Sequence, residues 1–237
     1  MQKVAILVDG AFYLKRAKFL FGEKTPKSRV DELVSYCNRH VKNSKRDLYR
    51  IFFYDCPPSE KTIYNPLTQK SVNLKKEPQY KWSNEFHNIL VTKRKVALRM
   101  GELLESTAGY VLKAEPTKKL LRKEITVDDL TELDFSLDIS QKGVDMRIGL
   151  DISSLAHKSL VDKIILIAGD SDFVPAAKYA RREGIDFILD PMWHTIKPSL
   201  NEHVDGIQSC VKKPPLNLND NLCVKELNNY ENKEEKN

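Results

Sequence analysis

Four short runs of apolar residues most constrain what this chain of 237 residues can fold into. Each run, with its flanking residues, makes a segment of five to seven residues, the length of a buried strand. Segments with helical spacing of apolar residues separate the runs. This alternation predicts parallel βαβ units in an α/β fold with an open, doubly wound sheet. The strands are expected at residues 3–8, 48–54, 163–168 and 185–189, and the helices at residues 12–21, 29–43, 143–157 and 173–183.

The middle of the chain shows weaker patterns. Residues 58–78 contain prolines and lysines with little periodicity, so we expect an excursion from the domain there. Residues 80–95 favour a helix, 98–104 and 110–113 favour short strands, and 117–135 favour a mobile arm. The predicted organisation is an α/β domain of residues 1–57 and 136–211, a basic insertion of residues 58–135 and a poorly ordered tail of residues 212–237.

The net charge of +6 is concentrated in the middle third of the sequence. Residues 58–125 hold 14 basic and 7 acidic residues, whereas the rest of the chain holds 25 and 26. Basic residues with aromatic neighbours suit a phosphate backbone with stacked bases, although a solvated surface would use the same lysines. The candidate nucleic-acid-binding residues are Lys93, Arg94, Lys95, Arg99, Lys118, Lys119, Arg122 and Lys123, with Tyr80, Trp82 and Tyr110 as candidate stacking surfaces.

Several classes of protein are disfavoured by what the sequence lacks. No apolar stretch approaches the roughly 20 residues of a membrane span, and the start of the chain is too weakly apolar for a signal peptide. Neither G-x-G-x-x-G nor G-x-x-x-x-G-K-[ST] occurs, which argues against a dinucleotide enzyme and a P-loop NTPase. The four cysteines lack zinc-ligand spacing, which favours a reduced, cytoplasmic protein. An oligomer is possible, but the sequence does not predict one.

Aspartates follow two of the expected strands and begin one of the expected helices. Asp9 ends the first apolar run, Asp170 and Asp172 follow a later run, and Asp145 lies at the start of the helix after residue 143. The carboxyl ends of parallel strands line a common crevice, so these four side chains can converge there. Several carboxylates in one cleft repel one another unless a cation lies among them. All-oxygen ligation of this kind suits Mg²⁺ or Mn²⁺.

A structural interpretation competes at each of these positions, because Asp is a favoured helix cap. Asp9, Asp170 and Asp172 can each be explained in this way. Asp55 also follows a strand, and it is expected either as a turn residue or as a peripheral member of the site. Asp151 lies six residues beyond Asp145 and faces away from it on a helix, so we expect either a structural role or a supporting role behind the metal ligands there.

Four segments of the sequence resemble a known family. VAILVDGAFY, IFFYDCPP, QKGVDMRIGLDI and LIAGDSDFVPAAKYARREGI are together similar to an NYN domain of the LabA-like (DUF88) group, within the PIN-like nuclease superfamily. The similarity covers roughly residues 3–57 and 139–207. Many members carry an Asn two or three residues after the first Asp, where this chain has Ala11 and Phe12. The resemblance implies a PIN-like fold.

The resemblance also implies a metal-dependent nuclease, with RNA favoured over DNA as the substrate. Asp9, Asp145, Asp170 and Asp172 would then hold Mg²⁺ or Mn²⁺, Ser171 would help to orient a water and Lys142 would contact a phosphate. A non-catalytic RNA-binding or regulatory protein that keeps the NYN fold is the main alternative. A phosphatase of another α/β family ranks third, because the sequence after Asp9 lacks the D-x-D pair of one common phosphatase class.

Overall fold

The computed structural model describes residues 2–214, which form two compact units. Unit 1 contains residues 2–62, 73–107 and 139–212, and unit 2 contains residues 63–72, 108–138 and 213–214. The expected tail therefore falls largely on residues outside the described part of the chain. The division also differs from the expected one, because residues 73–107 lie inside the expected insertion and yet belong to unit 1.

Unit 1 is built on an open parallel sheet of six strands, which confirms the predicted α/β fold class. The order β10-β9-β8-β1-β2-β5 makes β1 a central strand, with β2 and β5 on one side of it and β8, β9 and β10 on the other. The strands are β1 (Lys3–Asp9), β2 (Asp47–Asp55), β5 (Val96–Met100), β8 (Lys163–Ile167), β9 (Asp186–Asp190) and β10 (Gly206–Ile207). The connections change direction between β1 and β8, so this pair is the topological switch point of the sheet.

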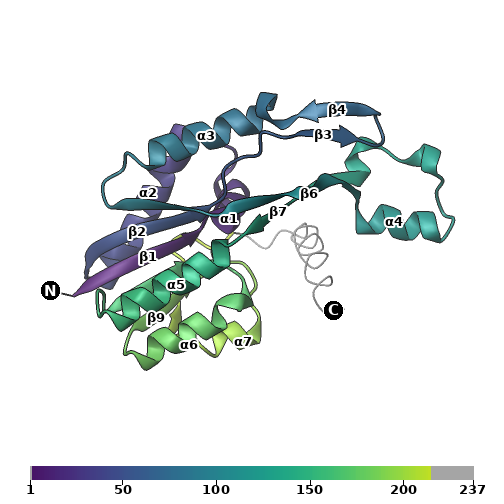
Figure 1. Cartoon of the computed structure of the whole chain (residues 1–237). Coiled ribbons are helices and arrows are strands. Elements are labelled where there is room, and N and C mark those ends of the chain that lie inside the picture. Colours follow the sequence, from purple (N-terminus) through teal and green to yellow (C-terminus); the bar gives the residue numbers. More distant parts are fainter. Residues whose placement is uncertain (1, 215–237) are drawn as a thin grey trace. The chain divides into compact units, whose positions relative to one another are not determined.

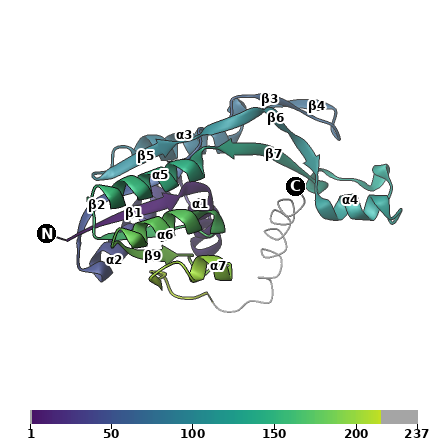
Figure 2. The ribbon, with the colours of Figure 1, turned by 60° about the horizontal axis from the view of Figure 1, so that its bottom comes forward.

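Helices cover both faces of the sheet, as Figures 1 and 2 show for unit 1. Successive residues of a strand point to opposite faces, so Ile6 packs under one set of helices and Leu7 under the other. Both side chains are fully buried. One face carries α1 (Gly10–Phe21), α2 (Pro26–Ser44) and α3 (Pro78–Leu90), and the other carries α5 (Val144–His157) and α6 (Val174–Arg182). This two-sided burial explains why the strands have nearly continuous apolar sequences.

The expected middle helix is α3, but it ends five residues earlier than the pattern indicated. Lys95 has a positive φ of 61°, and residues 91–95 form the turn that leads into β5. Phe86 and Leu90 are fully buried against α2 and the sheet, which places α3 in unit 1. The expected strand at 98–104 is the end of β5 and the start of β6 (Glu102–Leu112), separated at Gly101.

Unit 2 contains the hairpin strands β3 (Thr62–Asn65) and β4 (Lys70–Asn73) and the helix α4 (Ala114–Leu121). Strands β6 and β7 (Phe135–Lys142) pair with each other and contribute residues to both units. The segment 117–135, expected as a mobile arm, contains the end of α4 and two short 3₁₀ turns. Thr126 and Thr131 each form a capping box with the Asp three residues later. Two further short helices, η1 (Leu74–Lys76) and α7 (Pro198–Asn201), belong to unit 1.

No helix in the described part of the chain combines the length and the apolar character needed to cross a lipid bilayer. Cys37, Cys56 and Cys210 are free thiols, and Cys223 lies outside the described residues. The expected cytoplasmic location stays a prediction.

Candidate acidic site at the carboxyl edge of the sheet

Carboxylates follow four adjacent strands at the carboxyl edge of the sheet. Asp9 ends β1, Asp55 ends β2 and Asp190 ends β9, while Asp170 comes three residues after the end of β8. The β1–β8 switch point lies in the middle of this row. In open α/β sheets this edge, at the switch point, is where ligands bind. The topology therefore brings Asp9 and Asp170 to the same edge, as the sequence predicted.

Asp9 serves both the fold and the candidate site. Its Oδ1 accepts a hydrogen bond of 3.1 Å from the backbone N–H of Phe12 and so caps α1. The next residue must be small, because a Cβ on Gly10 would lie 2.5 Å from the carbonyl oxygen of Tyr54. The helix consequently starts directly against β2, and the Asp9 carboxyl is held at the strand end, half-buried.

The surroundings of the Asp9 carboxyl strongly change its pKa. Burial raises its pKa from 3.8 to about 7, against a smaller lowering by the Phe12 N–H. The negative charges of Asp145 and Asp55 are smaller contributions to the same rise. These three carboxylates therefore form one electrostatic group, although residues 9, 55 and 145 are far apart in the sequence.

Asp145 reaches this group from the first turn of α5. Gly143 precedes the helix with a φ of +78°, a left-handed conformation that favours glycine. Val144 then packs into the core, and Asp145 is exposed. A carboxylate in the first turn of a helix is stabilised by the helix dipole. The K-G-V-D sequence is thus explained by a turn, an anchor and a carboxylate, with Lys142 exposed at the end of β7.

Asp55 is buried and held by a histidine that the sequence analysis missed. Its Oδ2 lies 2.9 Å from Nε2 of His87, on α3, and its Oδ1 accepts a 2.8 Å hydrogen bond from the N–H of Cys56. Of its two expected roles, the structure shows features of both, since Asp55 bonds its own turn and also acts electrostatically on Asp9. The only sequence signal for His87 is its position, one residue after Phe86 on the apolar face of α3.

Asp170 and Asp172 form an exposed loop beside this group. Oδ1 of Asp170 accepts a 3.1 Å hydrogen bond from the N–H of Asp172 and caps a short 3₁₀ turn, η4 (Ser171–Phe173). Gly169, just before it, has no room for a side chain, since a Cβ would lie 2.6 Å from the Phe12 ring. The G-D-S-D loop therefore packs against the residue that Asp9 caps. The capping alternative is realised at both Asp9 and Asp170, and neither cap removes the carboxyl from the sheet edge.

No three His, Cys, Asp or Glu side chains within residues 2–214 are grouped as a metal centre. The predicted set of Asp9, Asp145, Asp170 and Asp172 shares an edge but is not a preassembled cage. Mg²⁺ does not need one, because it usually keeps several waters and binds through one or two protein carboxylates. The oxygen-only donors of Asp9 and Asp145 fit an ion of this kind.

Several of the candidate basic residues already contact acidic or carbonyl groups. Lys93 pairs with Asp31 at 2.7 Å, and Nζ of Lys95 donates to the carbonyl of Leu48. Both precede β5, so they lie at the amino edge of the sheet, opposite the carboxylates. Arg94 is exposed in the same turn. This cluster and the carboxylates are thus at opposite ends of the strands.

Arg99 is held by Asp151 on α5. The guanidinium Nε lies 3.1 Å from Oδ2 of Asp151, and it stacks over the Phe52 ring at 5.2 Å. The same Asp151 oxygen accepts a 2.8 Å hydrogen bond from the hydroxyl of Tyr54. Asp151 therefore has a structural role, one of the two expected for it.

The remaining basic candidates belong to unit 2. Lys118 pairs with Glu115 at 3.0 Å, and Arg122 lies 3.9 Å from Glu124. Lys119 and Lys123 are exposed on and just after α4. All eight basic positions stay predictions as nucleic-acid contacts.

A second carboxylate network, missed by the sequence analysis, lies at the end of β9. Asp190 is fully buried, and its Oδ2 contacts the hydroxyl of Tyr36 and, at 2.6 Å, Nε2 of His40. Its Oδ1 accepts hydrogen bonds from the N–H of Met192 at 2.8 Å and the hydroxyl of Ser209 at 2.7 Å. The available signal was an Asp directly after an apolar run, as at Asp9.

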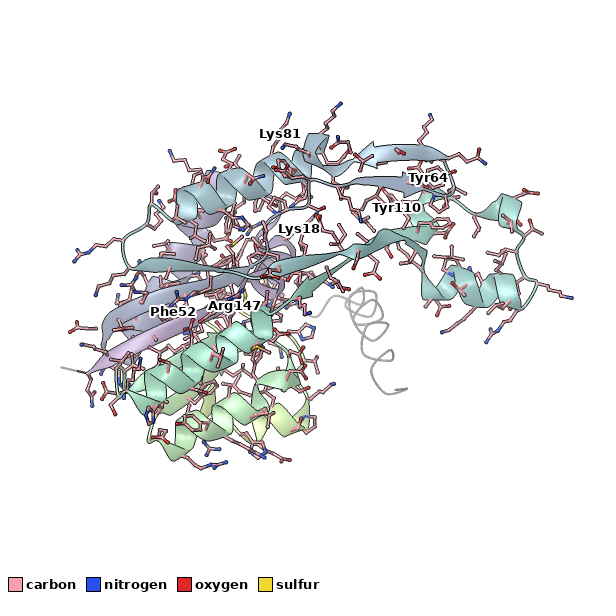
Figure 3. All side chains as sticks on the ribbon, viewed as in Figure 1. Lys18, Phe52, Tyr64, Lys81, Tyr110 and Arg147 are labelled. Carbon is pink, nitrogen blue, oxygen red and sulfur yellow. The ribbon has the colours of Figure 1, made fainter. Side chains whose placement is uncertain are left out.

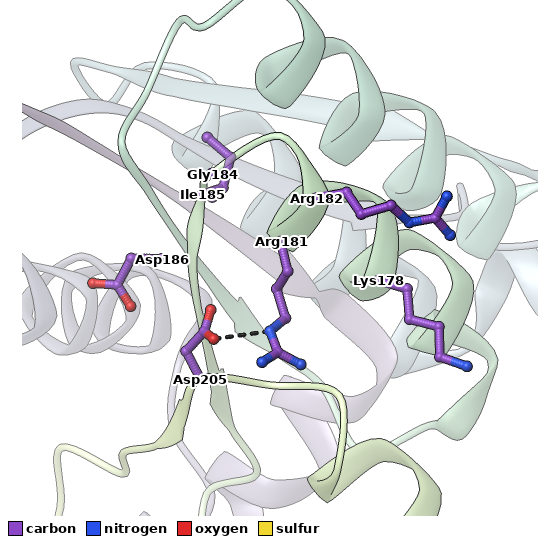
Figure 4. Close-up of a pocket in the computed structure, with 7 residues that line it drawn as sticks. All are labelled: Lys178, Arg181, Arg182, Gly184, Ile185, Asp186 and Asp205. Atoms are coloured by element: carbon purple, nitrogen blue, oxygen red, sulfur yellow. Dashed lines mark hydrogen bonds and ion pairs between the residues drawn. The ribbon is translucent and has the colours of Figure 1, made fainter.

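A cavity of about 620 Å³ lies at the amino edge of the sheet, beside the start of β9 (Figure 4). Arg181 in its wall pairs with Asp205 at 2.8 Å. Lys178 and Arg182 lie near the carboxyl end of α6, where the helix dipole favours cations. The helix end is a sufficient reason for these basic residues, and the cavity is distant from the carboxylates along the strands.

Comparison with known protein families identifies the family to which the chain belongs. The family described as the NYN domain matches residues 3–204. The chain therefore belongs to the NYN-domain family, which is part of the PIN-like nuclease superfamily. No curated protein matches the chain. Among solved structures, a protein of unknown function from Vibrio parahaemolyticus is similar, with 15% identity, a TM-score of 0.47, and coverage of 89% of this chain and 94% of that one.

Proposed function

We propose that the protein is a metal-dependent ribonuclease of the LabA-like group that hydrolyses phosphodiester bonds. The NYN family supports a nuclease and the binding of nucleic acid. The choice of RNA over DNA, and of the LabA-like group, rests on the sequence resemblance. A reduced, cytoplasmic location is part of the same proposal, supported by the free thiols of Cys37, Cys56 and Cys210.

The observation that carries the proposal is the joint position of three carboxylates at the sheet edge. Asp9, Asp55 and Asp145 come from β1, β2 and α5, and the charges of the last two raise the pKa of the first. Such repulsion is unfavourable in a fold unless a cation relieves it.

Asp9 and Asp145 would hold Mg²⁺ or Mn²⁺, with Asp170 and Asp172 as further donors from the neighbouring loop. The ion, when bound, would neutralise negative charge that develops on the phosphate and would lower the pKa of a bound water. The carboxylates of the chain would hold the ion at the sheet edge. All of the proposed donor atoms are oxygens, with no sulfur or nitrogen among them. This donor set is typical of Mg²⁺ and Mn²⁺ sites.

Other residues of the chain orient and bind. His87 holds Oδ2 of Asp55, so the negative charge beside Asp9 stays in one place. Ser171 lies between Asp170 and Asp172, where its hydroxyl would orient a water. Lys142, exposed two residues before α5, would bind a phosphate oxygen on the substrate.

The test is cleavage of a mixed RNA pool in single-turnover conditions with Mn²⁺, Mg²⁺ or EDTA. Asp145→Asn keeps the size of the side chain and removes its charge, and it should lower the rate at least ~100-fold, which is about 2.7 kcal/mol of activation free energy. Asp128→Asn, at an exposed position of unit 2, is the matched control and should cleave at the wild-type rate. Equal cleavage by wild type and the Asp145 variant would refute the site.

One observation favours the alternative of a non-catalytic RNA-binding or regulatory protein. Many relatives carry an Asn two or three residues after the first Asp, where this chain has Ala11 and Phe12. In this alternative, RNA binds with the same salt dependence in wild type and Asp145→Asn, and no divalent ion gives cleavage. Cleavage that requires Mn²⁺ or Mg²⁺ and is stopped by EDTA would exclude it.

A further inference from the structure

A second pocket in unit 1 lies between α1, the start of α2 and α3, outside the acidic site. Its volume is about 350 Å³, within the range of small-ligand sites. Four basic side chains and one indole line it, together with a few other groups. The lining residues include Lys15, Lys18, Glu23, Lys24, Arg29 and Trp82.

We propose that this pocket binds one nucleotide of a single-stranded RNA substrate, with its base on Trp82 and its phosphates at Lys15 and Lys18. The inference rests on the proposed nuclease function and adds to it the path of the strand. The fixed position of the Trp82 indole, the positive charge of the pocket wall and the position of α1 support this proposal.

The indole of Trp82 is fixed before any ligand arrives. It stacks on Phe86 at a centroid distance of 5.2 Å and an angle of 8° between the rings. Its Nε1 donates a 3.0 Å hydrogen bond to the carbonyl of Lys24. Phe86 therefore packs on one ring face, and the Trp82 side chain lines the pocket. A fixed aromatic face is a sequence-tolerant surface for a base, because every base can stack on it.

The charge of the pocket suits a phosphate. Lys24 and Arg29 are both bound by Glu32, at 2.6 Å and 2.5 Å, and Lys18 pairs with exposed Glu23 at 2.6 Å. Lys15 is exposed and has no ion pair among the residues that the structure describes. Four cations face two carboxylates, so the wall keeps a net positive charge. The exposed Lys18–Glu23 pair is weak and exchanges easily for a phosphate.

The position of α1 connects the pocket to the acidic site. The helix begins at Gly10, directly after Asp9. At a rise of 1.5 Å per residue, Lys15 and Lys18 lie about 8 and 12 Å along the helix axis from Gly10. Figure 3 shows Lys18 on this helix and Lys81, the neighbour of Trp82, on α3. A strand bound at the carboxylates therefore reaches the pocket within a few nucleotides.

The chain contains two tryptophans, so one substitution makes Trp82 a specific reporter. In the full-length Trp193→Phe variant, the emission of Trp82 is followed while a hexa-adenylate RNA is added in EDTA, so that nothing is cleaved. We expect saturable quenching that weakens as the salt concentration rises. AMP should quench only at much higher concentration. Binding of hexa-adenylate without any change in Trp82 emission would overturn the proposal, and equal affinity for AMP would assign the pocket to a free nucleotide instead of a strand.

Charge-reversal variants test the phosphate contacts. Lys15→Glu with Lys18→Glu should weaken hexa-adenylate binding at least ~10-fold, measured by anisotropy of a labelled RNA. Lys178→Glu with Arg182→Glu makes the same change of charge at the other cavity and should have a much smaller effect. Equal effects of the two double variants would show only a general attraction and would overturn the pocket.

Two variants of the indole separate stacking from folding. Trp82→Phe keeps an aromatic ring and should keep most of the affinity, whereas Trp82→Ala should weaken binding roughly tenfold and raise KM for cleavage to a similar degree. Circular dichroism checks that both variants are folded. Loss of affinity in both, with normal folding, would contradict a stacked base.

These results can be separated from those of the proposed nuclease. If Asp145→Asn stops cleavage while the Lys15 and Lys18 variant binds RNA normally, the nuclease stands and the pocket fails. If hexa-adenylate quenches Trp82 but no ion gives cleavage, the pocket stands as a binding site and the nuclease fails.

Discussion

Two aspartate–histidine pairs occupy equivalent places in the sheet of unit 1, and they differ in what they leave available. Asp55 with His87 follows β2, and Asp190 with His40 follows β9. A carboxylate has about four lone-pair positions. All four of Asp190 are used, by Tyr36, His40, Met192 and Ser209, and both members of its pair are fully buried. Asp55 uses two and lies 8% exposed.

Residue type and topology therefore do not by themselves define a functional site. The Asp190 network uses every acceptor position of its carboxylate and holds the turn after β9, where Met192 and Trp193 have positive φ values of 46° and 62°. Among the described residues, Nδ1 of the buried His40 has no hydrogen-bond partner. Arg16 supports the same turn through a 2.8 Å hydrogen bond to the Met192 carbonyl. Asp55 instead keeps acceptor capacity and acts on Asp9. We therefore expect the Asp55–His87 pair, more than the Asp190–His40 pair, to contribute to chemistry at the edge.

The largest expected effect is on stability, at the Asp190–His40 pair. Asp190→Asn keeps the shape of the side chain but presents an amide N–H₂ to groups that donate, so one or more of them loses its acceptor. We expect the free energy of unfolding to fall by about 4 kcal/mol, because breaking a buried, hydrogen-bonded charge network costs this much. Urea denaturation measures it. Cleavage per folded molecule should stay near wild type, and a selective loss of cleavage would break the comparison.

The next largest effect is on activity, at the Asp55–His87 pair. Asp55→Asn should reduce divalent-ion-dependent RNA cleavage about 100-fold, or about 2.7 kcal/mol of activation free energy, since the charge beside Asp9 is lost. The cost in stability should be smaller than for Asp190→Asn, because fewer buried donors depend on Asp55. Single-turnover cleavage and urea denaturation of the same preparation report both quantities. A variant that unfolds but cleaves normally would reverse the roles of the two pairs.

The pH dependence of stability provides a test at Asp9, the carboxyl on which Asp55 acts. In the folded chain the pKa of Asp9 is raised from 3.8 to about 7, mainly by burial, so the folded state holds this proton more tightly than the unfolded state. Without divalent ions, this contribution to stability is complete below pH about 4 and is lost as the pH rises to about 7, by an amount on the order of 2 kcal/mol after allowance for partial exposure.

Asp9→Asn removes the titrating group and should flatten the stability curve between these pH values. The measurement is the free energy of unfolding in EDTA as a function of pH. Added Mg²⁺ should stabilise the wild type more at pH 8 than at pH 5, since the ion binds the deprotonated carboxyl. A wild-type curve that rises between pH 4 and 7 in parallel with that of the variant would contradict the assignment.

The smallest effect is expected at Tyr36, one of the hydrogen-bond donors to Asp190. Tyr36→Phe removes one hydroxyl donor from Asp190 and leaves the ring in the core, where it contacts Tyr13 and Phe21. The free energy of unfolding should fall by about 1 kcal/mol, the net contribution of one hydrogen bond. Thermal unfolding followed by circular dichroism detects this. No change at all would show that three donors are enough for Asp190.

The strands, most of the helices and the edge that carries Asp9 and Asp170 could be predicted from the sequence, because apolar periodicity and strand-end position are local signals. His87 and the place of α3 could not. They depend on the packing of Phe86 and Leu90 against a sheet that the sequence does not display. Asp190 was predictable in principle, but a sequence gives no count of the donors around a carboxylate. The basic residues before β5 show the same limit, since composition does not tell which end of a strand a lysine occupies.

The central place of β1 has a consequence for synthesis of the chain. Val4 pairs with Lys163, so one side of the first strand has no neighbour until more than 160 residues have been made. Tyr36 and His40 likewise wait for a carboxylate that is translated about 150 positions later. A nascent chain therefore carries an apolar strand edge for most of its translation, in a form that invites pairing with other chains. The sheet can therefore be completed only after the last third of the chain has been made.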